Sequence, residues 1–458
     1  MSAEDQTPKI VLNKDQQTVV ELVRNGANVF LTGAAGTGKS LTLSNIIAQA
    51  LDLDEVVYVT ATTGVAAANL REAAGQVGVR TFHSWASIGL GKYAASAHAK
   101  FIRRNKDARE RIINTDLLII DEVSMMDPEF LAKVNDVVQI VRSWDPATRH
   151  IADKPFGGIQ LVFTGDFGQL PPVTRHGARP SFLFQDPLWD KIVDKTVMLS
   201  QVYRQKNQEF VDLLMRLRTG ALTDADVQAI RATASNTLGG DKLKPTTLFC
   251  RNADVDRMNL DELRKLDSPV FKFKSSDDGD EKAVKAANFS FPAFLPLKVG
   301  AQVMLLINEC PELGLINGSR GFVSDITIGG AEDGGPTIEV TYGDDLVRTY
   351  ECHKQEDKDE VDKLLASRKQ FPFKLAWCMT IHKSQGMTID LLDIDLSGAF
   401  EISQAYVALS RGVGLDRMRV RNFSKNSVKT SPDVLKFQLA LKRPREREVN
   451  TPTKILKT

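Results

Sequence analysis

Cysteine is scarce in this chain, and the four cysteines present do not form closely spaced pairs. They are Cys250, Cys310, Cys352 and Cys378 in a sequence of 458 residues. A zinc site or a disulfide framework needs cysteines at short, repeated spacings, so neither is expected. This pattern is typical of proteins from a reducing intracellular compartment.

Long hydrophobic runs are absent as well. No stretch approaches the roughly 18–20 consecutive apolar residues that cross a bilayer. The first residues, Met1 to Gln6, are polar and acidic, unlike a secretory signal or an arginine-rich transit peptide. We therefore expect no membrane association and no secretory or mitochondrial targeting peptide, which leaves the nucleus or the cytoplasm.

The chain has almost no excess of one charge. It carries 59 Lys and Arg against 58 Asp and Glu, a formal net charge of +1, whereas proteins that bind nucleic acids are often strongly basic. Residues 92–111 and 442–457 are locally basic. A solvated face or tail is the simpler interpretation of each stretch alone, and Lys442 to Arg445 fits a nuclear signal no better than a basic tail.

The most specific pattern in the chain is a phosphate-binding loop. Residues 33–40 match G-x-x-x-x-G-K-S without a mismatch, between an apolar run and a stretch with helical spacing. Backbone N–H groups of such a loop surround a triphosphate, its lysine contacts the β- and γ-phosphates, and its serine hydroxyl ligates Mg²⁺. The predicted contacts are Gly33, Ala34, Ala35, Gly36, Thr37, Gly38, Lys39 and Ser40, with Ser40 also a metal ligand.

A second nucleotide element follows another apolar run. Leu117 to Ile120 form a strand-like segment that ends in Asp121 and Glu122. A carboxylate at a strand tip beside a phosphate loop holds Mg²⁺, and the next carboxylate orients and deprotonates water. We assign Asp121 to the metal and Glu122 to the general base. The alternative, an exposed acidic turn, is disfavoured by the phosphate loop upstream.

Three more polar residues are candidates for contact with the γ-phosphate. Gln169 follows the apolar run 160–164, at the carboxyl end of a strand, where ligands of α/β sheets bind. Arg204 and Arg411 are isolated arginines, for which a surface position is the usual alternative. Phosphoryl transfer gains most from an arginine that arrives from another domain, so this pair favours two lobes with the nucleotide between them.

Three segments are rich in small hydroxyl residues: 60–67, 81–85 and 380–388. Short hydroxyl side chains and backbone amides hold phosphates without steric conflict, and His83 lies beside Phe82 and Trp85, where it can contact bases. Packed loop histidines are the simpler interpretation of His83 and His382 when each is taken alone.

The distribution of apolar runs indicates the fold class. Continuous apolar runs alternate with helical stretches in the first half, which predicts an α/β fold with a parallel sheet. From about residue 268, short strands with Gly-rich turns predict a small β-barrel insert. The α/β character returns at about residue 373, and the end of the chain from about residue 443 is expected to be disordered.

In their order along the chain, these segments resemble a known family. The series is the phosphate loop, Thr-Ala-Thr-Thr-Gly (60–64), Thr-Phe-His-Ser (81–84), Ile-Asp-Glu-Val-Ser-Met-Met-Asp (120–127), Thr-Gly-Asp-Phe-Gly-Gln-Leu-Pro-Pro-Val (164–173), Val-Tyr-Arg-Gln (202–205), Thr-Ile-His-Lys-Ser-Gln-Gly-Met-Thr (380–388) and Tyr-Val-Ala-Leu-Ser-Arg (406–411). Over about residues 10–440 the chain resembles the superfamily-one, B-type DNA helicases of the petite-integration-frequency family.

The resemblance implies an ATP- and Mg²⁺-dependent enzyme that moves 5′→3′ on single-stranded DNA. Its implied substrates are single-stranded DNA, junctions between single and double strands, forks, RNA–DNA hybrids and G-quadruplexes, in replication, repair, recombination or telomere maintenance. It implies that Gln16 contacts adenine and that Gly386 joins the nucleotide site. The implied DNA contacts are Thr62, Gly64, His83, Ser84, Thr380, His382, Lys383 and Ser384. We expect a monomer in solution.

The resemblance also divides the chain. It implies two RecA-like phosphate-loop lobes with parallel sheets, a small wedge subdomain and an SH3-like β-barrel insert. The expected bounds are 1–83 and 112–197 for the first lobe, 84–111 for the wedge, 198–267 and 373–440 for the second lobe, 268–372 for the insert and 441–458 for a basic disordered tail.

Three positions depart from the residues that the family usually has. Asn13 replaces Ser, Tyr203 replaces Phe and Ser403 replaces Gly. Two other functions stay open, a RecD-like helicase subunit of a nuclease or recombination complex and a nucleotide-dependent switch that does not move on DNA. No cluster of carboxylates indicates a nuclease, and Arg204 and Arg411 argue against the switch.

Overall fold

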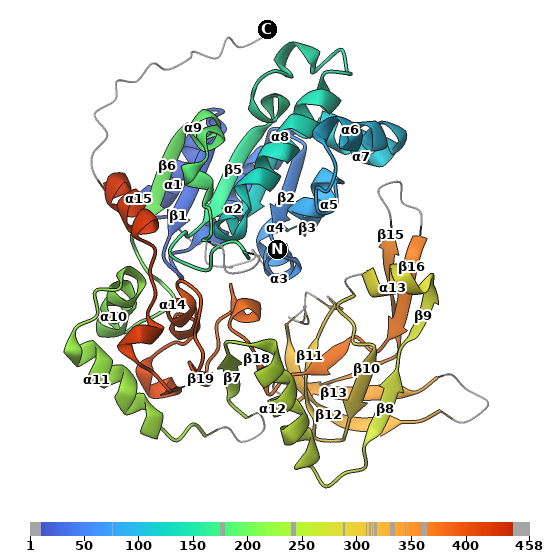
Figure 1. Cartoon of the computed structure of the whole chain (residues 1–458), viewed down its shortest axis with the longest axis vertical. Helices are drawn as coiled ribbons and strands as arrows, with labels where there is room; N and C mark the ends of the chain where they lie inside the picture. Colours follow the sequence, from blue (N-terminus) through green and yellow to red (C-terminus); the bar gives the residue numbers. More distant parts are fainter. Residues whose placement is uncertain are drawn as a thin grey trace, which may run out of the picture.

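The computed structural model places the chain in an upper half, a lower left part and a lower right part in the view of Figure 1. It describes residues 11–75, 77–174, 179–239, 244–286, 289–307, 309–310, 313, 315, 318–329, 335–343, 345–358 and 364–442. The polar start of the chain and residues 443–458 of the expected tail, with most of the candidate nuclear signal, lie outside this range. Residues 441 and 442 belong to a helix.

The upper half is built on one six-stranded sheet whose neighbouring strands are all parallel. Phe30 and Leu31 are adjacent in one strand but join different cores, because successive strand residues point to opposite faces. Both faces are therefore covered, as the continuous apolar runs predict. The strand order is β3 (Val79–Thr81), β2 (Val57–Ala61), β4 (Leu117–Asp121), β5 (Gln160–Gly165), β1 (Val29–Gly33) and β6 (Lys195–Leu199).

The helices of this half are α1 (Lys14–Arg24), α2 (Lys39–Asp52), α3 (Gly64–Asn69), α4 (Arg71–Ala74), α5 (Phe82–Ala86), α6 (Ala95–Arg104), α7 (Lys106–Asn114), α8 (Pro128–Arg142) and α9 (Pro187–Ile192).

The basic stretch 92–111 forms helices that pack on the first sheet's core. Ala99 and Ile102 of α6 and Ile112 of α7 are buried in the cluster that also contains Phe30. The expected limits of the wedge, 84 and 111, fall inside α5 and α7. The reason is that apolar residues of both helices are buried in the first core, namely Phe82 and Trp85 of α5 and Ala108 and Ile112 of α7.

A second sheet of four parallel strands lies at the lower left. Its order is β18 (Cys378–Thr380), β7 (Thr246–Phe249), β19 (Leu392–Asp395) and β20 (Met418–Arg421). Its helices are α10 (Gln208–Thr219), α11 (Asp224–Ala232), α12 (Asn252–Arg264) and α14 (Gln404–Leu409), and the short turn η7 (His382–Ser384) follows β18.

The last helix, α15 (Pro432–Lys442), returns to the first sheet (Figure 1). The Phe437 ring lies 4.3 Å from the Phe184 ring and 5.6 Å from the Phe167 ring. Val434 is buried in the same cluster. The division expected from the sequence placed residues 432–440 in the second lobe, whereas these aromatic contacts attach the helix to the first.

The insert at the lower right is made of antiparallel strands around one core. Its largest sheet has the order β14 (Leu346–Tyr350), β13 (Thr337–Tyr342), β12 (Arg320–Thr327), β11 (Gln302–Leu305) and β17 (Phe373–Leu375), so its strands continue past residue 372. The remaining elements are β8 (Phe271–Lys274) paired with β10 (Phe294–Leu297), helix α13 (Glu281–Ala286), and a sheet of β15 (His353–Lys358), β16 (Leu364–Gln370) and β9 (Ser276–Gly279).

This architecture confirms the expected fold class of two parallel α/β lobes with a β insert. None of the four cysteines forms a disulfide. Within the described part of the chain, no helix is both long and apolar enough to cross a membrane.

Candidate functional site

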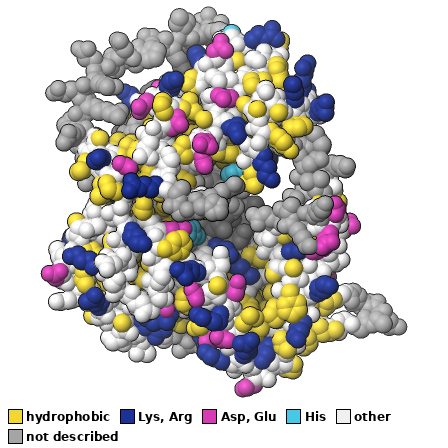
Figure 2. Space-filling model, in the orientation of Figure 1, with side chains coloured by type: hydrophobic (Ala, Val, Ile, Leu, Met, Phe, Trp, Pro, Cys, Tyr) yellow, Lys and Arg dark blue, Asp and Glu magenta, His cyan; other side chains and the backbone are white. Residues whose placement is uncertain are grey.

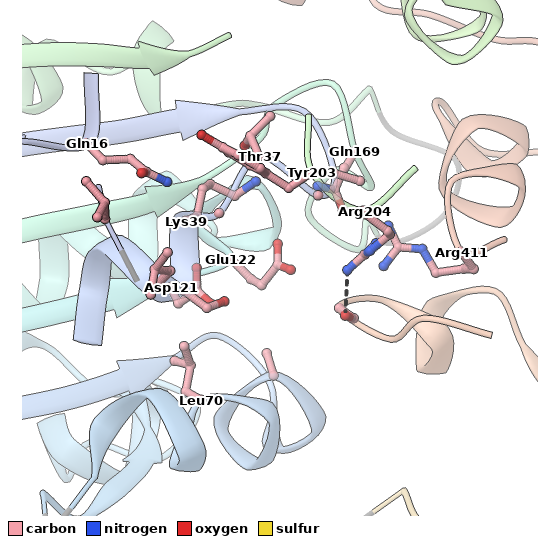
Figure 3. A pocket seen from close by; sticks show the side chains of 18 residues that line it. Gln16, Thr37, Lys39, Leu70, Asp121, Glu122, Gln169, Tyr203, Arg204 and Arg411 are labelled. Atoms are coloured by element: carbon pink, nitrogen blue, oxygen red, sulfur yellow. Dashed lines mark hydrogen bonds between the residues drawn. The ribbon is translucent and has the colours of Figure 1, made fainter. Parts of the chain in front are cut away.

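A cavity of about 500 Å³ opens at the carboxyl ends of β1 and β4, between the first sheet and the segments that carry Arg204 and Arg411 (Figure 3). The residues predicted to bind the nucleotide, to bind the metal or to act in catalysis all line it, except Gly33 and Ala34. The lining residues are Val11, Gln16, Ala35, Gly36, Thr37, Gly38, Lys39, Ser40, Leu41, Ala66, Leu70, Asp121, Glu122, Gln169, Tyr203, Arg204, Gly386 and Arg411.

The phosphate loop is shaped by two glycines in the left-handed region. Gly36 has φ +80° and Gly38 has φ +84°, conformations that other residues adopt only with strain. A Cβ on Gly36 would also lie 2.4 Å from the Arg204 Cβ. The loop therefore packs directly against the segment that carries Arg204, and the Gly36 carbonyl accepts a hydrogen bond from the Tyr203 N–H at 2.7 Å.

Lys39 is turned back onto its own loop. Its ammonium donates hydrogen bonds to the carbonyls of Gly33 at 2.8 Å and Ala34 at 3.0 Å. Burial lowers the pKa of Lys39, although the charges of Asp166 and Glu122 oppose this shift. Gly33 and Ala34 thus contribute to the site through the carbonyl groups that hold this lysine.

Asp121 is the last residue of β4, Glu122 follows it, and both line the cavity. Burial, followed by the charge of Glu122, raises the pKa of Asp121 to about 7. Glu122 has φ 54° and ψ 42°, a strained conformation for a residue other than glycine. The Ser40 hydroxyl lines the same cavity as Asp121. This pair of oxygen donors fits Mg²⁺, which takes one or two protein ligands and completes its shell with phosphates and water.

Arg204 and Arg411 approach the cavity from the side of the second sheet (Figure 3). Arg204 donates to the carbonyls of Gly386 at 3.2 Å and Ser410 at 3.4 Å. Arg411 donates to the Val407 carbonyl at 3.0 Å, and burial, together with the charge of Arg204, lowers its pKa to about 10. Neither guanidinium forms a salt bridge with a described residue, so both charges favour an anionic ligand in the cavity.

One end of the cavity is bounded by Gln16, in the first turn of α1. Its side-chain carbonyl accepts from the Asn13 N–H, and the Asn13 side chain accepts from the Gln16 N–H, both at 2.9 Å. This capping box fixes the orientation of the Gln16 amide. Its Nε2 atom is buried and donates to no described residue, so it can donate to a ligand.

Asn13 and Tyr203, two positions that depart from the family's usual residues, contact each other. The Asn13 amide donates to the Tyr203 hydroxyl at 2.8 Å. That hydroxyl donates in turn to the Gln201 side chain at 2.9 Å. Nothing in the sequence indicates that these two positions are in contact.

The sequence also did not reveal two contacts that join the first lobe to helices of the second sheet. One starts from the phosphate loop and the other from the segment that follows β5. The Ala35 N–H donates to the Tyr406 hydroxyl of α14 at 3.2 Å. Arg218 of α10 donates to both carboxylate oxygens of the fully buried Asp166, at 3.0 and 2.5 Å. Burial lowers the pKa of Arg218, but the Asp166 carboxylate outweighs burial and raises this pKa above its usual range.

A further missed contact links Gln385 with Glu122. The Gln385 Nε2 donates to the Glu122 Oε2 at 3.0 Å across 263 residues of sequence. Gln385 stands inside a motif that the sequence singled out, and its neighbours His382 and Lys383 were selected. Only the folded arrangement reveals that its side chain reaches the other lobe.

The predicted DNA contacts of the first lobe lie around the ends of β2 and β3. Gly64 and Ser84 are exposed. The Thr62 hydroxyl donates to the Glu122 carbonyl at 3.0 Å. The His83 ring is half-buried and stacks on the Phe130 ring at 4.1 Å, and burial lowers the pKa of His83.

The predicted DNA contacts of the second lobe lie in and around η7. Lys383 is exposed, and the His382 Nε2 lies 2.6 Å from the Glu401 Oε2. Thr380 and Ser384 are buried; the Thr380 hydroxyl accepts from the Lys383 N–H at 3.4 Å and the Ser384 hydroxyl donates to the Ile381 carbonyl at 2.8 Å. In this structure the two hydroxyls shape the turn that presents His382 and Lys383.

A second cavity, of about 330 Å³, lies beside Lys383 between α12 and β10. Lys374, which sequence reasoning missed, lines it as well. Burial, together with the charge of Lys383, lowers the pKa of Lys374 to about 8. The half-exposed Phe294 and the carboxylate of Asp256 also line this cavity.

Comparison with known proteins identifies the family. Residues 11–228 match the PIF1-like helicase model, and residues 283–326 match the model of the DNA helicase Pif1 2B domain. The chain is 37% identical to the human ATP-dependent DNA helicase PIF1 over 442 aligned residues, and these cover 96% of this chain. It spans 65% of the length of that human relative.

Two solved structures are similar over nearly the whole fold. The crystal structure of Pif1 helicase from Candida albicans has a TM-score of 0.84 and 34% identity, over 94% of this chain and 100% of that one. Pif1 helicase from Bacteroides in complex with ADP-AlF3 and single-stranded DNA has a TM-score of 0.70 and 27% identity, over 94% and 98% of the two chains. Together with the two family models, these similarities show that the chain belongs to the PIF1-like helicase family.

Proposed function

We propose that this chain is an ATP-dependent DNA helicase that moves 5′→3′ on single-stranded DNA and unwinds duplexes. The observation that carries the proposal is the cavity in which the phosphate loop and two carboxylates of one lobe face Arg204 and Arg411 from the other side. In such a site, nucleotide binding and hydrolysis change how the lobes meet. The direction of movement rests on the family resemblance.

ATP would bind with its phosphates on the loop. Lys39 would exchange the carbonyls of Gly33 and Ala34 for the β- and γ-phosphates. Ser40 and Asp121 would hold Mg²⁺, which neutralises phosphate charge when it is bound. Glu122 would accept a proton from the attacking water, and Gln169 would contact the γ-phosphate.

The two arginines complete the charge balance of the reaction. Among the described residues, Arg204 and Arg411 donate only to neutral acceptors. Closure of the lobes on a triphosphate would give both guanidinium groups an anionic partner, and positive charge at this place stabilises the transition state of phosphoryl transfer. Gly386 lines the cavity, and its carbonyl accepts a hydrogen bond from Arg204 at 3.2 Å.

The position of Gln16 is evidence that the adenine base binds at the far end of the cavity. Its Nε2 is a buried donor without a described acceptor, and a buried donor of this kind costs about 1–3 kcal/mol unless a ligand satisfies it. A ring nitrogen of adenine supplies such an acceptor. We therefore assign the base to the space between Gln16 and Tyr203.

The DNA strand would cross both lobes. Its contacts in the first lobe are Thr62, Gly64, His83 and Ser84, and in the second lobe they are His382 and Lys383 on a turn that Thr380 and Ser384 stabilise. Figure 2 shows histidine side chains on the upper and lower sides of the hollow between the two halves of this face, and Lys and Arg side chains over both halves. Lys374 adds a cation with no acidic partner in hydrogen-bonding range among the described residues.

The chain division follows the same proposal. The six-stranded and four-stranded sheets are the two RecA-like lobes, helices α6 and α7 are the wedge, and the antiparallel strands are the SH3-like insert. We propose that a monomer carries out the reaction on forked duplexes, and that RNA–DNA hybrids and G-quadruplexes are opened by the same movement.

Duplexes with a single tail test this proposal. Unwinding of a duplex with only a 5′ tail, and not of one with only a 3′ tail, is expected, and the opposite preference would refute the direction. Mass measurement of the active species in solution separates a monomer from a RecD-like subunit, which needs its complex. A nucleotide switch would hydrolyse ATP at the same rate with and without DNA.

A further inference from the structure

Glu122 is held by one residue from each of the two segments that we assign to DNA. The Thr62 hydroxyl donates to its carbonyl oxygen at 3.0 Å, and the Gln385 amide donates to its carboxylate at 3.0 Å. Thr62 follows β2 in the first lobe, and Gln385 follows η7 in the second. The assigned general base is thus the meeting point of both DNA segments, although it lies in the nucleotide cavity.

The segment around Gln385 also holds both arginines. Arg204 donates to the Gly386 carbonyl at 3.2 Å, and Arg411 donates to the Met387 carbonyl at 3.4 Å. Residues 385–387 therefore contact the assigned base and both arginines of the site. Lys383, two residues earlier, is exposed on the turn that leads into this segment.

The contact with Gln385 opposes the role of Glu122 as a base. A general base must accept a proton from water at its carboxylate oxygen, and the Gln385 amide occupies the Glu122 Oε2 at 3.0 Å. Gln385 is buried, so water does not compete freely for its amide. The contact therefore favours an arrangement in which the site is assembled but hydrolysis is slow.

We propose that Gln385 restrains Glu122 while no DNA is bound, and that a strand bound at His382 and Lys383 shifts residues 384–387 and releases the carboxylate. This inference rests on the proposed function, since it assigns the coupling between DNA binding and hydrolysis at the same site. Gln385 is a positioning residue, because it acts through Glu122. Release of the same segment also frees Arg204 and Arg411 for the γ-phosphate.

The test replaces Gln385 by residues whose side chains cannot reach or donate to Glu122. Gln385→Met keeps the length of the side chain without the amide, and Gln385→Asn keeps the amide on a chain one methylene shorter. ATP turnover is measured with and without saturating oligodeoxythymidylate. For both variants we expect DNA-free kcat to rise about tenfold, the scale of a lost hydrogen bond to a charged group. The KM for ATP should stay near the wild-type value.

A matched control removes a buried glutamine amide elsewhere. Gln370 is buried in the insert and donates to the Phe273 carbonyl at 3.1 Å. Gln370→Met should leave the ratio of DNA-stimulated to DNA-free turnover unchanged. A rise in turnover cannot come from partial unfolding, so the expected gain separates the restraint from a structural role.

Each outcome decides between defined alternatives. Unchanged DNA-free turnover in both Gln385 variants, or a fall with and without DNA, overturns the restraint while the helicase assignment stands. If the wild-type chain itself shows no stimulation by single-stranded DNA, the proposed function fails first. A rise in DNA-free turnover with a smaller stimulation ratio supports the inference.

Discussion

The side-chain amide of Asn13 donates a hydrogen bond to the hydroxyl of Tyr203 at 2.8 Å. Each residue stands at a position where the resemblance implies a different one, and the pair joins the start of α1 to the segment that carries Arg204. Tyr203 lines the nucleotide cavity, and Asn13 caps the helix that presents Gln16. The two departures therefore form one structural unit at the proposed base site.

A double-mutant cycle tests this unit. Tyr203→Phe removes the hydroxyl that Asn13 contacts, and Asn13→Ser removes the amide but keeps a capping hydroxyl. Because the contact is exposed, we expect each single change to raise the KM for ATP about two- to threefold, which corresponds to about 0.5 kcal/mol. The double variant should resemble either single variant. Multiplication of the two single effects would show that the residues are independent.

The buried ion pair between Asp166 and Arg218 should matter for stability. Arg218→Met leaves the Asp166 carboxylate buried without its partner, which typically costs about 3–5 kcal/mol. Arg417→Met is the control, because its pair with Asp390 lies on the surface and exposed pairs contribute at most about 1 kcal/mol. Urea unfolding compares the two variants. Equal losses of stability would contradict the assigned role of the buried pair.

Lys374 should make DNA affinity depend on pH. Burial and the charge of Lys383 lower its pKa to about 8, and Asp256 and Lys383 are the charged groups that share its cavity. A bound phosphate favours the charged form, so affinity is greatest below this pKa and falls as pH rises through it. Between pH 7 and pH 9 we expect a loss of about tenfold at most.

Fluorescence anisotropy of labelled oligodeoxythymidylate measures this loss. Lys374→Gln should bind more weakly at pH 7 and lose most of the pH dependence, and its salt slope should fall by about 0.7. Lys195→Gln, at an exposed lysine of β6, should keep the wild-type profile. A Lys374→Gln variant with the full pH dependence would place the titration elsewhere.

The phosphate loop gives the plainest prediction. Lys39→Ala removes the cation assigned to the β- and γ-phosphates and should lower ATP turnover about 100-fold or more. Unwinding should be lost with it, whereas binding of single-stranded DNA should persist because the assigned DNA residues lie elsewhere. Steady-state hydrolysis and anisotropy on the same preparation check both halves. Normal turnover would remove the basis of the nucleotide assignment.

The positions of site residues at the carboxyl ends of strands were predictable from the sequence. Asp121 and Gln169 follow continuous apolar runs, and parallel strands bring their carboxyl ends to one edge. Gly36 and Lys39 belong to a loop whose spacing has few other uses. The side chains predicted for this edge therefore line one cavity.

Contacts between distant segments were not predictable. Nothing local to Gln385 or Tyr406 indicates that their partners are Glu122 and the Ala35 amide. The polar strands Ser276–Gly279 and His353–Lys358 lack apolar alternation, the main sequence signal for a strand. Both strands pair with β16, and the ion pair between Arg368 of β16 and Asp277 of β9 at 2.7 Å, which only the fold reveals, supports one of these pairings.

The most direct test of the central claim measures ATP turnover of the purified chain with and without single-stranded DNA. The proposed coupling between the nucleotide cavity and the DNA segments predicts that saturating oligodeoxythymidylate raises kcat severalfold or more, and that Lys39→Ala abolishes turnover in both conditions. Turnover that is the same with and without DNA would contradict a DNA-driven motor and favour a nucleotide-dependent switch.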